Sequence, residues 1–461
     1  MLNPASSTTA KYEFYDNGDV ASVSSQINQQ YRVTAGGSLS GSIRVPGDKS
    51  ISHRSIMLGA LAEGTTEVTG FLEGEDALAT LAAFRAMGVD IEGPDKGKVT
   101  IHGVGMHGLK APEHDLYVGN SGTSIRLLSG LLAGQSFDVT MTGDQSLSGR
   151  PMRRVTDPLA LMGANIESHD GKPPLTIHGV TDLKAIDYPL PMASAQVKSC
   201  LLLAGMYAQG KTSVTEPAPT RDHTERMLTG MGYPVEVNGN QISIVGGGTL
   251  KATQIDVPAD ISSATFFMVG ASIAPGSDIT LLHVGINPTR IGVINILRLM
   301  GADISLANER ITGGEPVADI RVRYAPLKGI NIPEEQVPLA IDEFPALFIA
   351  AACAEGETLL TGAEELRVKE SDRIQVMADG LQALGVDAKP TADGIRITGG
   401  KIGAGEVHSH SDHRIAMSFA MAALRAEGTI VIHDTANVAT SFPGFVELAA
   451  SCGLHIELNH D

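Results

Sequence analysis

Residues 59–70 read GALAEGTTEVTG, in which an Ala/Leu-rich segment stops near Gly64 and a Thr/Val-rich segment follows. Ala and Leu favour helices, Thr and Val favour strands, and glycine is a common helix stop. The same pattern recurs at six glycines in chain order: Gly64, Gly134, Gly210, Gly276, Gly356 and Gly428. The sequence therefore predicts six junctions at which a helix gives way to a strand.

A second pattern alternates with the first. Residues 84–91 read FRAMGVDI, where helix-spaced apolar residues meet a glycine and an apolar segment follows. Its glycines are Gly88, Gly163, Gly232, Gly301, Gly385 and Gly453. Because the two series interleave, the chain after residue 30 divides into six units of about 72 residues, a period typical of repeat architectures.

Each unit should contain a helix, a strand, a second helix and then two strands around a Gly-rich turn. Residues 101–110 (IHGVGMHGLK) and 244–252 (IVGGGTLKA) are examples of this expected turn. Helices and strands that alternate within every unit indicate an α/β protein built from repeats rather than one long sheet. The length suits two groups of three units, with a join near Pro258.

Two nucleotide-binding patterns occur in the wrong structural context. Residues 205–212 (GMYAQGKT) fit the P-loop pattern, but a helix is expected before them and a strand after them, the reverse of a P-loop. Residues 103–108 fit GxGxxG, yet Pro112 and its neighbours cannot open the required helix. We therefore expect no nucleotide cofactor, and no cofactor of any other kind.

Composition limits the partners. The chain has 461 residues, a formal net charge of -18, 4% aromatic residues and no Trp, which argues against a nucleic-acid partner. No stretch of 18 uninterrupted apolar residues occurs, so we expect no membrane span. The widely spaced Cys200, Cys353 and Cys452 favour a reducing compartment, and residues 1–30 are expected to be a loose polar extension. A cytoplasmic monomer is the expectation.

The six expected helix starts are unusually polar. They lie at residues 46–54, 119–126, 191–198, 259–264, 341–346 and 411–416. Ser, Asp and Asn at such positions are ordinary N-caps, but capping does not explain the basic residues Lys49, Arg54, Arg126, Lys198 and Arg414. Cations are disfavoured at the positive end of a helix dipole unless an anionic ligand binds there. The loops before the second helices add five more basic residues: Arg150, Arg221, Arg367, Lys369 and Arg373. Each of these basic residues alone could be a solvated surface charge. Together they predict a binding site for a polyanionic small molecule.

Two carboxylates belong to the same set. Asp342 lies at a helix start, and Glu370 lies between Lys369 and Ser371. Neighbouring cations lower the pKa of a carboxyl group, which suits a general base, whereas burial raises it, which suits an acid. The sequence leaves open which effect is larger.

The run HSHSDH at residues 408–413 invites a metal hypothesis. His408 and His410 on an extended segment would point to one face and supply two ligands. Since the other repeats offer no partner ligands, we expect no metal site.

Five motifs in order resemble one known family. They are PGDKSISHRSIMLGAL (46–61), GNSGTSIRLL (119–128), PMASAQVKS (191–199), RVKESDR (367–373) and SDHRIAMSFA (411–420). The chain from about residue 36 to about residue 458 resembles the 5-enolpyruvylshikimate-3-phosphate (EPSP) synthases, class II. The resemblance implies a two-domain enolpyruvyl transferase fold with three βαβαββ units per domain and the active site in the interdomain cleft. It also implies a discontinuous first domain, residues 31–45 plus 258–461, and a second domain of residues 46–257.

The resemblance implies the reaction as well: transfer of the enolpyruvyl group of phosphoenolpyruvate to the 5-hydroxyl of shikimate 3-phosphate, with release of phosphate. Shikimate 3-phosphate would be held by Lys49, Ser50, Arg54, Ser194, Ala195, Gln196, Arg221, Asp342 and Lys369. Phosphoenolpyruvate would be held by Lys49, Gly122, Arg150, Gln196, Arg373 and Arg414, with Arg126 a further candidate. Asp342 would accept the proton of the attacking hydroxyl, Glu370 would exchange the proton at the vinyl carbon, and Lys49 would assist.

The chain departs from the family's patterns at three positions. Thr440 stands where many members have a Lys, and Ala195 replaces a second Ser common in class I forms. Gly122 stands where some glyphosate-tolerant class II forms have Ala, so we expect inhibition by glyphosate in competition with phosphoenolpyruvate.

Three rival functions fit the sequence less well. The enolpyruvyl transferases that act on UDP-N-acetylglucosamine begin their first helix with Lys-Asn and use a loop Cys, whereas this chain has Lys49-Ser50 and its cysteines lie in expected helices. RNA 3'-phosphate cyclases have a catalytic His pattern that this chain lacks. A non-catalytic anion-binding protein would not need the acid/base residues Asp342, Lys369 and Glu370.

Overall fold

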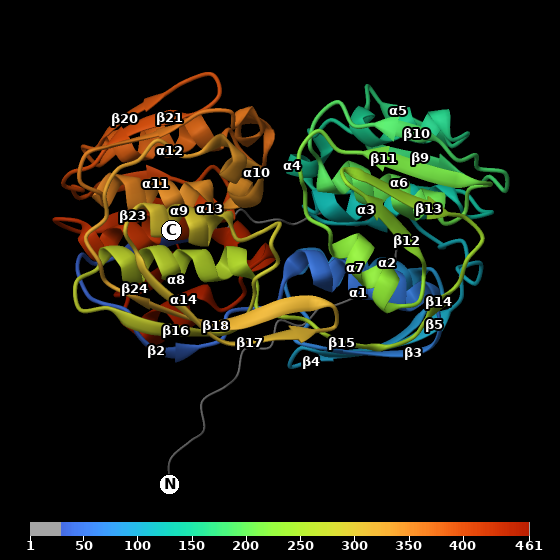
Figure 1. Cartoon of the computed structure of the whole chain (residues 1–461), viewed down its shortest axis with the longest axis horizontal. Helices are drawn as coiled ribbons and strands as arrows, with labels where there is room; N and C mark the ends of the chain where they lie inside the picture. The colour runs from blue at the N-terminus through green and yellow to red at the C-terminus, as the bar shows by residue number, and fades with distance from the viewer. Residues whose placement is uncertain (1–28, 461) are drawn as a thin grey trace, which may run out of the picture.

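The computed structural model describes residues 29–460, which form two lobes side by side (Figure 1). We use the name terminal lobe for residues 29–45 and 258–460 and the name middle lobe for residues 46–257, because each set contains one cluster of buried apolar side chains. Each lobe has its own cluster of buried apolar side chains, one drawn from residues 31–45 and 259–456 and the other from residues 51–257. Residues 1–28 of the expected extension lie outside the described residues, and the first strand begins at Gln29.

The chain crosses between the lobes twice, and the two crossings pair with each other. The Asp48 amide donates to the Pro258 carbonyl at 2.8 Å, and the Asp260 amide donates to the Pro46 carbonyl at 2.9 Å. Gly47 is required at the first crossing, because a Cβ there would lie 1.9 Å from the carbonyl oxygen of Gly70. The double crossing is therefore a tight two-stranded connection.

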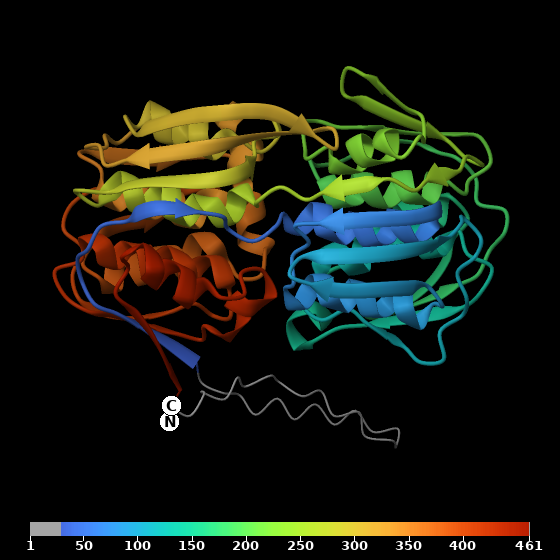
Figure 2. The same cartoon turned by 90° about the horizontal axis from the view of Figure 1, so that it is seen from below.

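The middle lobe contains three sheets. The sheet that includes residues 62–104, drawn in shades of blue, faces the viewer in Figure 2. The first has the order β14-β3-β5-β4, with β15 also paired to β3: β3 (Ala62–Thr69), β4 (Asp90–Asp95), β5 (Lys98–Val104), β14 (Leu250–Lys251) and β15 (Gln254–Asp256). The second has the order β6-β7-β9-β8: β6 (Leu116–Tyr117), β7 (Val139–Thr142), β8 (Asn165–His169) and β9 (Lys172–His178). The third has the order β10-β11-β13-β12: β10 (Asp187–Pro189), β11 (Lys211–Thr215), β12 (Val235–Asn238) and β13 (Gln241–Val245).

The terminal lobe repeats this arrangement. One sheet has the order β17-β18-β16-β2: β2 (Ser40–Ile43), β16 (Asp278–Gly285), β17 (Asp303–Thr312) and β18 (Glu315–Arg323). The next has the order β19-β21-β20: β19 (Glu357–Leu360), β20 (Asp387–Pro390) and β21 (Ile395–Thr398). The last has the order β22-β23-β1-β24: β1 (Gln29–Val33), β22 (Gly405–His408), β23 (Ile430–His433) and β24 (Ile456–His460).

Within a unit, a parallel strand pair is joined by a helix and the later strands pair antiparallel, as in β6-β7 (parallel) and β7-β9 and β8-β9 (antiparallel). This is the βαβαββ pattern, and the expected α/β repeat class is confirmed. The long β17-β18 hairpin also reaches the middle lobe (Figure 1), where the Glu315 carboxylate lies 2.7 Å from Nδ1 of His223.

The first helix of each unit lies inside its lobe. These inner helices are α1 (Lys49–Leu61), α3 (Gly122–Ala133), α6 (Ala195–Gly205), α8 (Ile261–Ile273), α11 (Phe344–Cys353) and α13 (His413–Ala422). All residues of α8 are buried, as expected of a helix that is apolar on every side. The inner helices contact one another and are covered by the sheets, so their N-terminal ends are the parts left free to build a site.

The second helices lie further out: α2 (Glu75–Ala86), α5 (Arg153–Leu161), α7 (His223–Gly230), α9 (Gly292–Leu299), α12 (Arg373–Ala383) and α14 (Phe445–Cys452), with α4 (Gln145–Ser148) before α5. The six glycines of the second sequence pattern follow them, and all have positive φ, from 81° to 115°. Only glycine adopts this conformation without strain, which explains why the pattern repeats in every unit.

One sequence prediction about glycine is wrong. The Gly-rich segments were expected to be turns between the two last strands, but Gly103 lies within the last strand, β5, and residues 105–108 and 246–248 follow the last strands of their units and lead to the next unit. Their glycines allow close approach of backbones: a Cβ on Gly103 would lie 2.1 Å from the Ala62 carbonyl oxygen, and one on Gly246 would lie 1.8 Å from that of Ala208. The two nucleotide-motif predictions are confirmed, since α6 precedes residues 206–210 and β11 follows, and no helix follows residues 103–108 before β6.

Within residues 29–460, one helical run has the length and hydropathy of a membrane span, Glu334–Cys353. It consists of η1 (Glu334–Gln336), α10 (Val337–Ala340), η2 (Ile341–Glu343) and α11. About two-thirds of its apolar window, 67%, is buried inside the protein, because α11 is an inner helix of the terminal lobe.

Candidate active site

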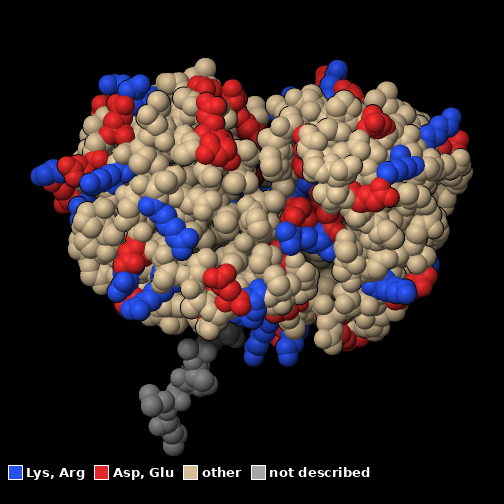
Figure 3. Space-filling model, in the orientation of Figure 1, with Lys and Arg blue, Asp and Glu red and all other residues tan. Residues whose placement is uncertain are grey.

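The expected polar helix starts are confirmed as the ends of the inner helices, and their small polar residues are caps. Five side chains accept a backbone N–H of the first turn: Asp48, Ser121, Ser194, Asp260 and Asp412. The caps occupy the helix ends themselves, and some charged residues beside them, such as Lys49 and Arg414, lie near the junction between the lobes. On the face in Figure 3, charged side chains of both signs are scattered over both lobes and also gather near this junction.

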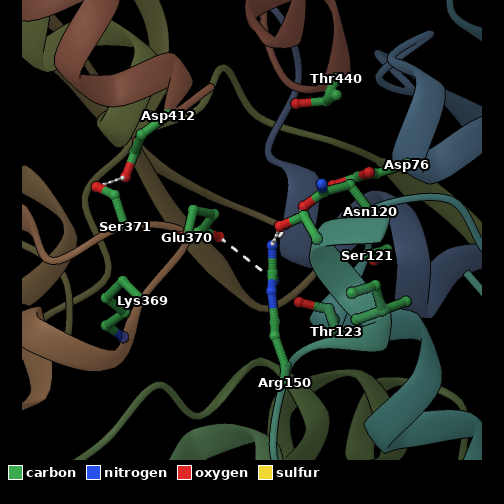
Figure 4. Close-up of polar contacts among 12 residues, drawn as sticks. Asp76, Asn120, Ser121, Thr123, Arg150, Lys369, Glu370, Ser371, Asp412 and Thr440 are labelled. Carbon is green, nitrogen blue, oxygen red and sulfur yellow. Dashed lines mark hydrogen bonds and ion pairs between the residues drawn. The ribbon is translucent and has the colours of Figure 1, made fainter. Parts of the chain in front are cut away.

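Two of the ion pairs that join the lobes involve Asp342 and Glu370. Arg221 of the middle lobe donates to the carboxylate of Asp342 in the terminal lobe. Arg150 of the middle lobe points toward Glu370 of the terminal lobe, with 3.9 Å between Nη1 and Oε1 (Figure 4). Both carboxylates expected to transfer protons thus lie at the interface, each opposite an arginine of the other lobe.

One guanidinium connects these carboxylates. Arg373, at the start of α12, is 1% exposed and donates to Asp342 at 3.2 Å and to Glu370 at 2.6 Å. Its Nε donates to Asp412 at 2.8 Å, and Asp412 also accepts from Ser371 at 3.0 Å (Figure 4). Because its fork is held by three carboxylates, Arg373 fixes the distance between the two expected proton-transfer groups.

Asp342 is ionised. Burial by itself would raise its pKa, but the surrounding cations hold that pKa well below its usual range. The cations responsible are Lys369, Arg221, Arg414 and Arg373. Lys369 Nζ lies 3.5 Å from Oδ1 of Asp342, and Arg414 donates to the Asp342 carbonyl at 3.1 Å. An ionised carboxylate with this surrounding can accept a proton.

Glu370 is ionised for the same reason, which answers the question left open by the sequence. Burial would raise its pKa, but Arg373, Arg150, His413 and Lys49 hold it well below its usual range. A bound anion that neutralised these cations would raise the pKa of Glu370. Glu370 can therefore act as a proton donor once anionic substrates fill the site.

A second set of contacts surrounds Gly122 at the start of α3. Arg126 donates to Gln196 Oε1 at 2.6 Å, and Gln196 donates to Thr123 at 3.0 Å. A Cβ on Gly122 would lie 2.8 Å from Nη1 of Arg126 and 3.1 Å from Nη1 of Arg150. The absent side chain leaves room for two guanidinium groups beside the helix end, an arrangement suited to a carboxylate or phosphate.

Lys49 occupies the end of α1 between two acids. Its Nζ lies 2.9 Å from Asp76, and its amide donates to Asp260 of the other lobe at 3.1 Å. Thr440 in η5 (Ala436–Thr440) donates its hydroxyl to the Asn437 carbonyl at 2.7 Å and adds no charge.

The remaining expected residues lie at the starts of α1 and α6. Ser50, Ser194 and Ala195 are half-buried there. Arg54 is buried and donates to Thr224 at 2.7 Å and to Ser199 at 2.9 Å, and burial lowers its pKa to about 10. Arg54 therefore joins α1 to α6 and α7 beneath the helix starts.

Lys198 differs from its expected place among the site cations. Its side chain is 1% exposed and lies 2.7 Å from Glu225 and 3.2 Å from Glu216, inside the middle lobe. The repeat predicted its position in the helix correctly, but the side chain points into the lobe, where two carboxylates neutralise it.

The sequence analysis did not single out Asn120 and Arg290, two residues that hold charged groups in place in the structure. Asn120 accepts from Arg150 and donates to Asp144 at 2.6 Å, so it orients Arg150 (Figure 4). Arg290 is buried in the double crossing, with nitrogens 2.7 Å from Asp48 and 3.1 Å from Asp260. The repeat could have indicated Arg290, because Arg290 precedes the second helix of its unit, as Arg150 and Arg221 precede theirs.

The histidine-rich run is divided by the fold. His408 stacks on His433 with 4.6 Å between ring centroids at the surface, whereas His413 is buried at the start of α13. Among residues 29–460, no group of three or more His, Cys, Asp or Glu side chains is arranged to hold a metal ion. The cysteines lie in helices α6, α11 and α14, and none is paired in a disulfide.

The fold and the site define the class: a two-lobed α/β enzyme of the enolpyruvyl transferase fold. The enolpyruvyl transferase NikO from Streptomyces tendae has this fold at 16% identity, with a TM-score of 0.75 over 94% of this chain and 99% of that one. The chain belongs to the EPSP synthase (3-phosphoshikimate 1-carboxyvinyltransferase) family, whose sequence profile matches residues 33–448.

Relatives with high identity support the same assignment. The 3-phosphoshikimate 1-carboxyvinyltransferase of Methylococcus capsulatus is 70% identical over 425 residues, which is 92% of this chain and 97% of the relative. That of Nitrosococcus oceani is 69% identical over 433 residues, 94% of this chain and 98% of the relative. The solved EPSP synthase from Acinetobacter baumannii is 65% identical, with a TM-score of 0.85 over 94% of this chain and all of that one, 100%.

Proposed function

We propose that this chain transfers the enolpyruvyl group of phosphoenolpyruvate to the 5-hydroxyl of shikimate 3-phosphate, releasing phosphate and 5-enolpyruvylshikimate 3-phosphate. Membership of the family supports the reaction. The observation that carries the proposal is the pair of carboxylates Asp342 and Glu370 at the junction of the lobes. The guanidinium of Arg373 contacts both, at 3.2 Å from Asp342 and 2.6 Å from Glu370. An anion-binding protein without catalysis would need no such pair of carboxylates.

The residues at Asp342 suit shikimate 3-phosphate. A phosphate needs cations and N–H donors, and ring hydroxyls need a carboxylate or ammonium partner. We assign this substrate to the residues named from the family's motifs: Lys49, Ser50, Arg54, Ser194, Ala195, Gln196, Arg221, Asp342 and Lys369. The approach of Lys369 to Asp342, at 3.5 Å, supports a shared contact to the ring hydroxyls.

The residues around Glu370 suit phosphoenolpyruvate. Its carboxylate and phosphate require several cations, and arginine forks bind such oxygens with two hydrogen bonds. We assign it to Lys49, Gly122, Arg150, Gln196, Arg373 and Arg414. The space that Gly122 leaves beside Arg126 and Arg150 supports this assignment.

The chemistry then needs one base and one acid. Asp342 takes the proton of the 5-hydroxyl as its oxygen bonds to the central carbon of phosphoenolpyruvate, and Glu370 delivers a proton to the vinyl carbon, giving a tetrahedral intermediate with a methyl group. Glu370 then removes a proton from that methyl group as the bond from carbon to the phosphate oxygen breaks. The steps involve no net oxidation or reduction, and side chains supply both the acid and the base, so we propose that the reaction uses no cofactor and no metal.

Closure of two domains would bring these groups together. We propose that the lobes are those domains, with boundaries at residues 31–45 plus 258–461 and 46–257; their separate cores support the division. Closure would expel water and strengthen every charge contact in the site. We further propose that the protein acts as a monomer in the cytoplasm, since nothing in this chemistry requires a second chain.

Phosphate release tests the function. The protein should release phosphate only when both shikimate 3-phosphate and phosphoenolpyruvate are present, and Asp342→Ala and Glu370→Ala should lower that rate by roughly 100-fold or more. UDP-N-acetylglucosamine in place of shikimate 3-phosphate is the control and should give no release. Phosphate release when UDP-N-acetylglucosamine replaces shikimate 3-phosphate would contradict the proposal. Undiminished rates of phosphate release in both variants would also contradict it.

A further inference from the structure

A buried cluster of three charges lies beneath the loop that carries Arg221. Lys198 of α6 has its Nζ 2.7 Å from Glu225 and 3.2 Å from Glu216, and the two acids are each 7% exposed. A buried charge is unfavourable unless it is paired, so the three side chains hold one another in place. Nothing in the proposed reaction requires a cation at Lys198, which leaves this cluster without a role.

Glu216 connects the cluster to the loop. Its backbone is fixed at the end of β11, since its amide donates to the Asn240 carbonyl at 2.9 Å and the Asn240 side chain donates to its carbonyl at 2.9 Å. The carboxylate of Glu216 also accepts from the hydroxyl of Thr220. Thr220 immediately precedes Arg221, so this hydrogen bond closes the loop from its base to the residue beside the guanidinium.

Glu225 fixes the other end of the same loop. It lies in the first turn of α7, next to Thr224, which accepts from Arg54 at 2.7 Å and donates to Ser199 at 2.8 Å. Consecutive residues of α6, Lys198 and Ser199, therefore hold the segments before and after Arg221. The direction of Arg221 toward Asp342 depends on both attachments.

We propose that Lys198 and Glu216 are positioning residues, which through Thr220 hold Arg221 in line with Asp342 and with the phosphate group of shikimate 3-phosphate. The inference rests on the proposed function, because it takes Arg221 as a contact to that substrate. Neither residue touches the substrate. Changes at Lys198 and Glu216 should therefore weaken the binding of shikimate 3-phosphate. They should leave the binding of phosphoenolpyruvate unchanged, because we assign that substrate to the residues around Arg150.

Thr220→Val is the sharpest variant, because it removes one hydroxyl from a half-buried side chain and leaves the buried charges paired. It should raise KM for shikimate 3-phosphate roughly three- to tenfold, the range expected for one hydrogen bond, with KM for phosphoenolpyruvate and the melting temperature unchanged. Thr220→Ser should restore the wild-type KM. Thr229→Val, at an exposed position of α7, is the matched control and should change neither constant.

Lys198→Met provides a second, coupled measurement. Burial raises the pKa of Glu225 even though Lys198 lowers it, so Glu225 can take up a proton when the lysine is removed. Lys198→Met should raise KM for shikimate 3-phosphate at least as far as Thr220→Val, and the double variant should be no worse than Lys198→Met alone.

Three outcomes would overturn the positioning role: an unchanged KM for shikimate 3-phosphate in Thr220→Val, equal increases in both KM values, or additive effects in the double variant. If Lys198→Met does not fold, the comparison of Thr220→Val, Thr220→Ser and Thr229→Val decides the question alone. Failure of the proposed function would be distinct, because the wild-type protein would then release no phosphate from the two substrates.

Discussion

Arg221 of the middle lobe donates a hydrogen bond directly to the carboxylate of Asp342 in the terminal lobe. The expected base is thus held in part by a cation from the opposite lobe: Arg221 acts beside Lys369, Arg414 and Arg373 of the terminal lobe to lower the pKa of Asp342. A change in the distance between the lobes would therefore alter the surroundings of the proposed base.

Removal of Arg221 should weaken both the binding of the acceptor and the base. Arg221→Gln is expected to lower kcat/KM for shikimate 3-phosphate by about 10- to 100-fold, since hydrogen bonds to charged groups contribute about 1.5–3 kcal/mol. Steady-state phosphate release measures the effect. Arg321→Gln, which removes an exposed ion pair to Asp278, is the control and should behave as wild type. Equal kcat/KM in the two variants would contradict the role of Arg221.

Acidification should destabilise the protein through Asp342 and Glu370. Their pKa values in the folded protein lie well below the ordinary 3.8 and 4.5, so the unfolded chain binds protons that the folded one does not. Their contribution to stability is complete above about pH 4.5 and is lost as the pH falls through the folded values. Urea midpoints at pH 6 and pH 3, the second of which lies below the ordinary pKa of 3.8, should differ less in Asp342→Asn than in the wild type, and an equal difference would contradict the low pKa.

Gly122→Ala should impair the binding of anions beside α3. A methyl group at Gly122 would lie 2.8 Å from Arg126 and 3.1 Å from Arg150, so the guanidinium groups must shift. We expect a higher KM for phosphoenolpyruvate and a larger inhibition constant for glyphosate, while KM for shikimate 3-phosphate changes little. Gly230→Ala is a control with no neighbour within 4 Å of the added Cβ. An undiminished wild-type rate at millimolar glyphosate would refute the expected inhibition.

Arg290→Met should destabilise the double crossing. Arg290 lies between Asp48, Asp260 and Glu343, the last at 3.9 Å, and its loss leaves buried carboxylates without their cation. Breaking a buried ion pair by removing one partner costs about 3–5 kcal/mol. The urea midpoint should fall clearly, whereas Arg323→Met, which removes an exposed pair to Asp303, should leave it nearly unchanged.

Much of the fold was predictable because its signals are local. A glycine with positive φ must follow each second helix, so Gly88 and its five counterparts report the repeat directly in the sequence. The caps and inner-helix starts follow from side-chain chemistry in the same way. The Gly-rich segments were assigned wrongly. Gly103 and Gly246 are glycines because the backbone of a residue distant in sequence packs against them, and a local sequence pattern does not distinguish this cause from a turn.

The sequence predicted which residues form the candidate site better than it predicted their charge contacts and pKa shifts. Arg150, Arg221 and Arg373 stand at equivalent positions of different units, and the structure brings them to one junction. The direction in which Lys198 points, and the balance between burial and cations at Glu370, depend on contacts between residues far apart in the chain. Sequence spacing carries no information about either.

Deuterium incorporation tests the central claim most directly: in D₂O the carboxyl proton of Glu370 is replaced by deuterium, Glu370 delivers it to the vinyl carbon to form a methyl group, and removal of a hydrogen from that methyl group leaves deuterium in part of the product. With both substrates in D₂O, the wild-type protein should give 5-enolpyruvylshikimate 3-phosphate that carries deuterium in its vinyl group, detected by mass spectrometry. Glu370→Gln should form little product and incorporate little deuterium, while Glu364→Gln, a nearby residue exposed in η3 (Glu364–Val368), should match the wild type. Wild-type product free of deuterium, or undiminished incorporation by Glu370→Gln, would contradict the account.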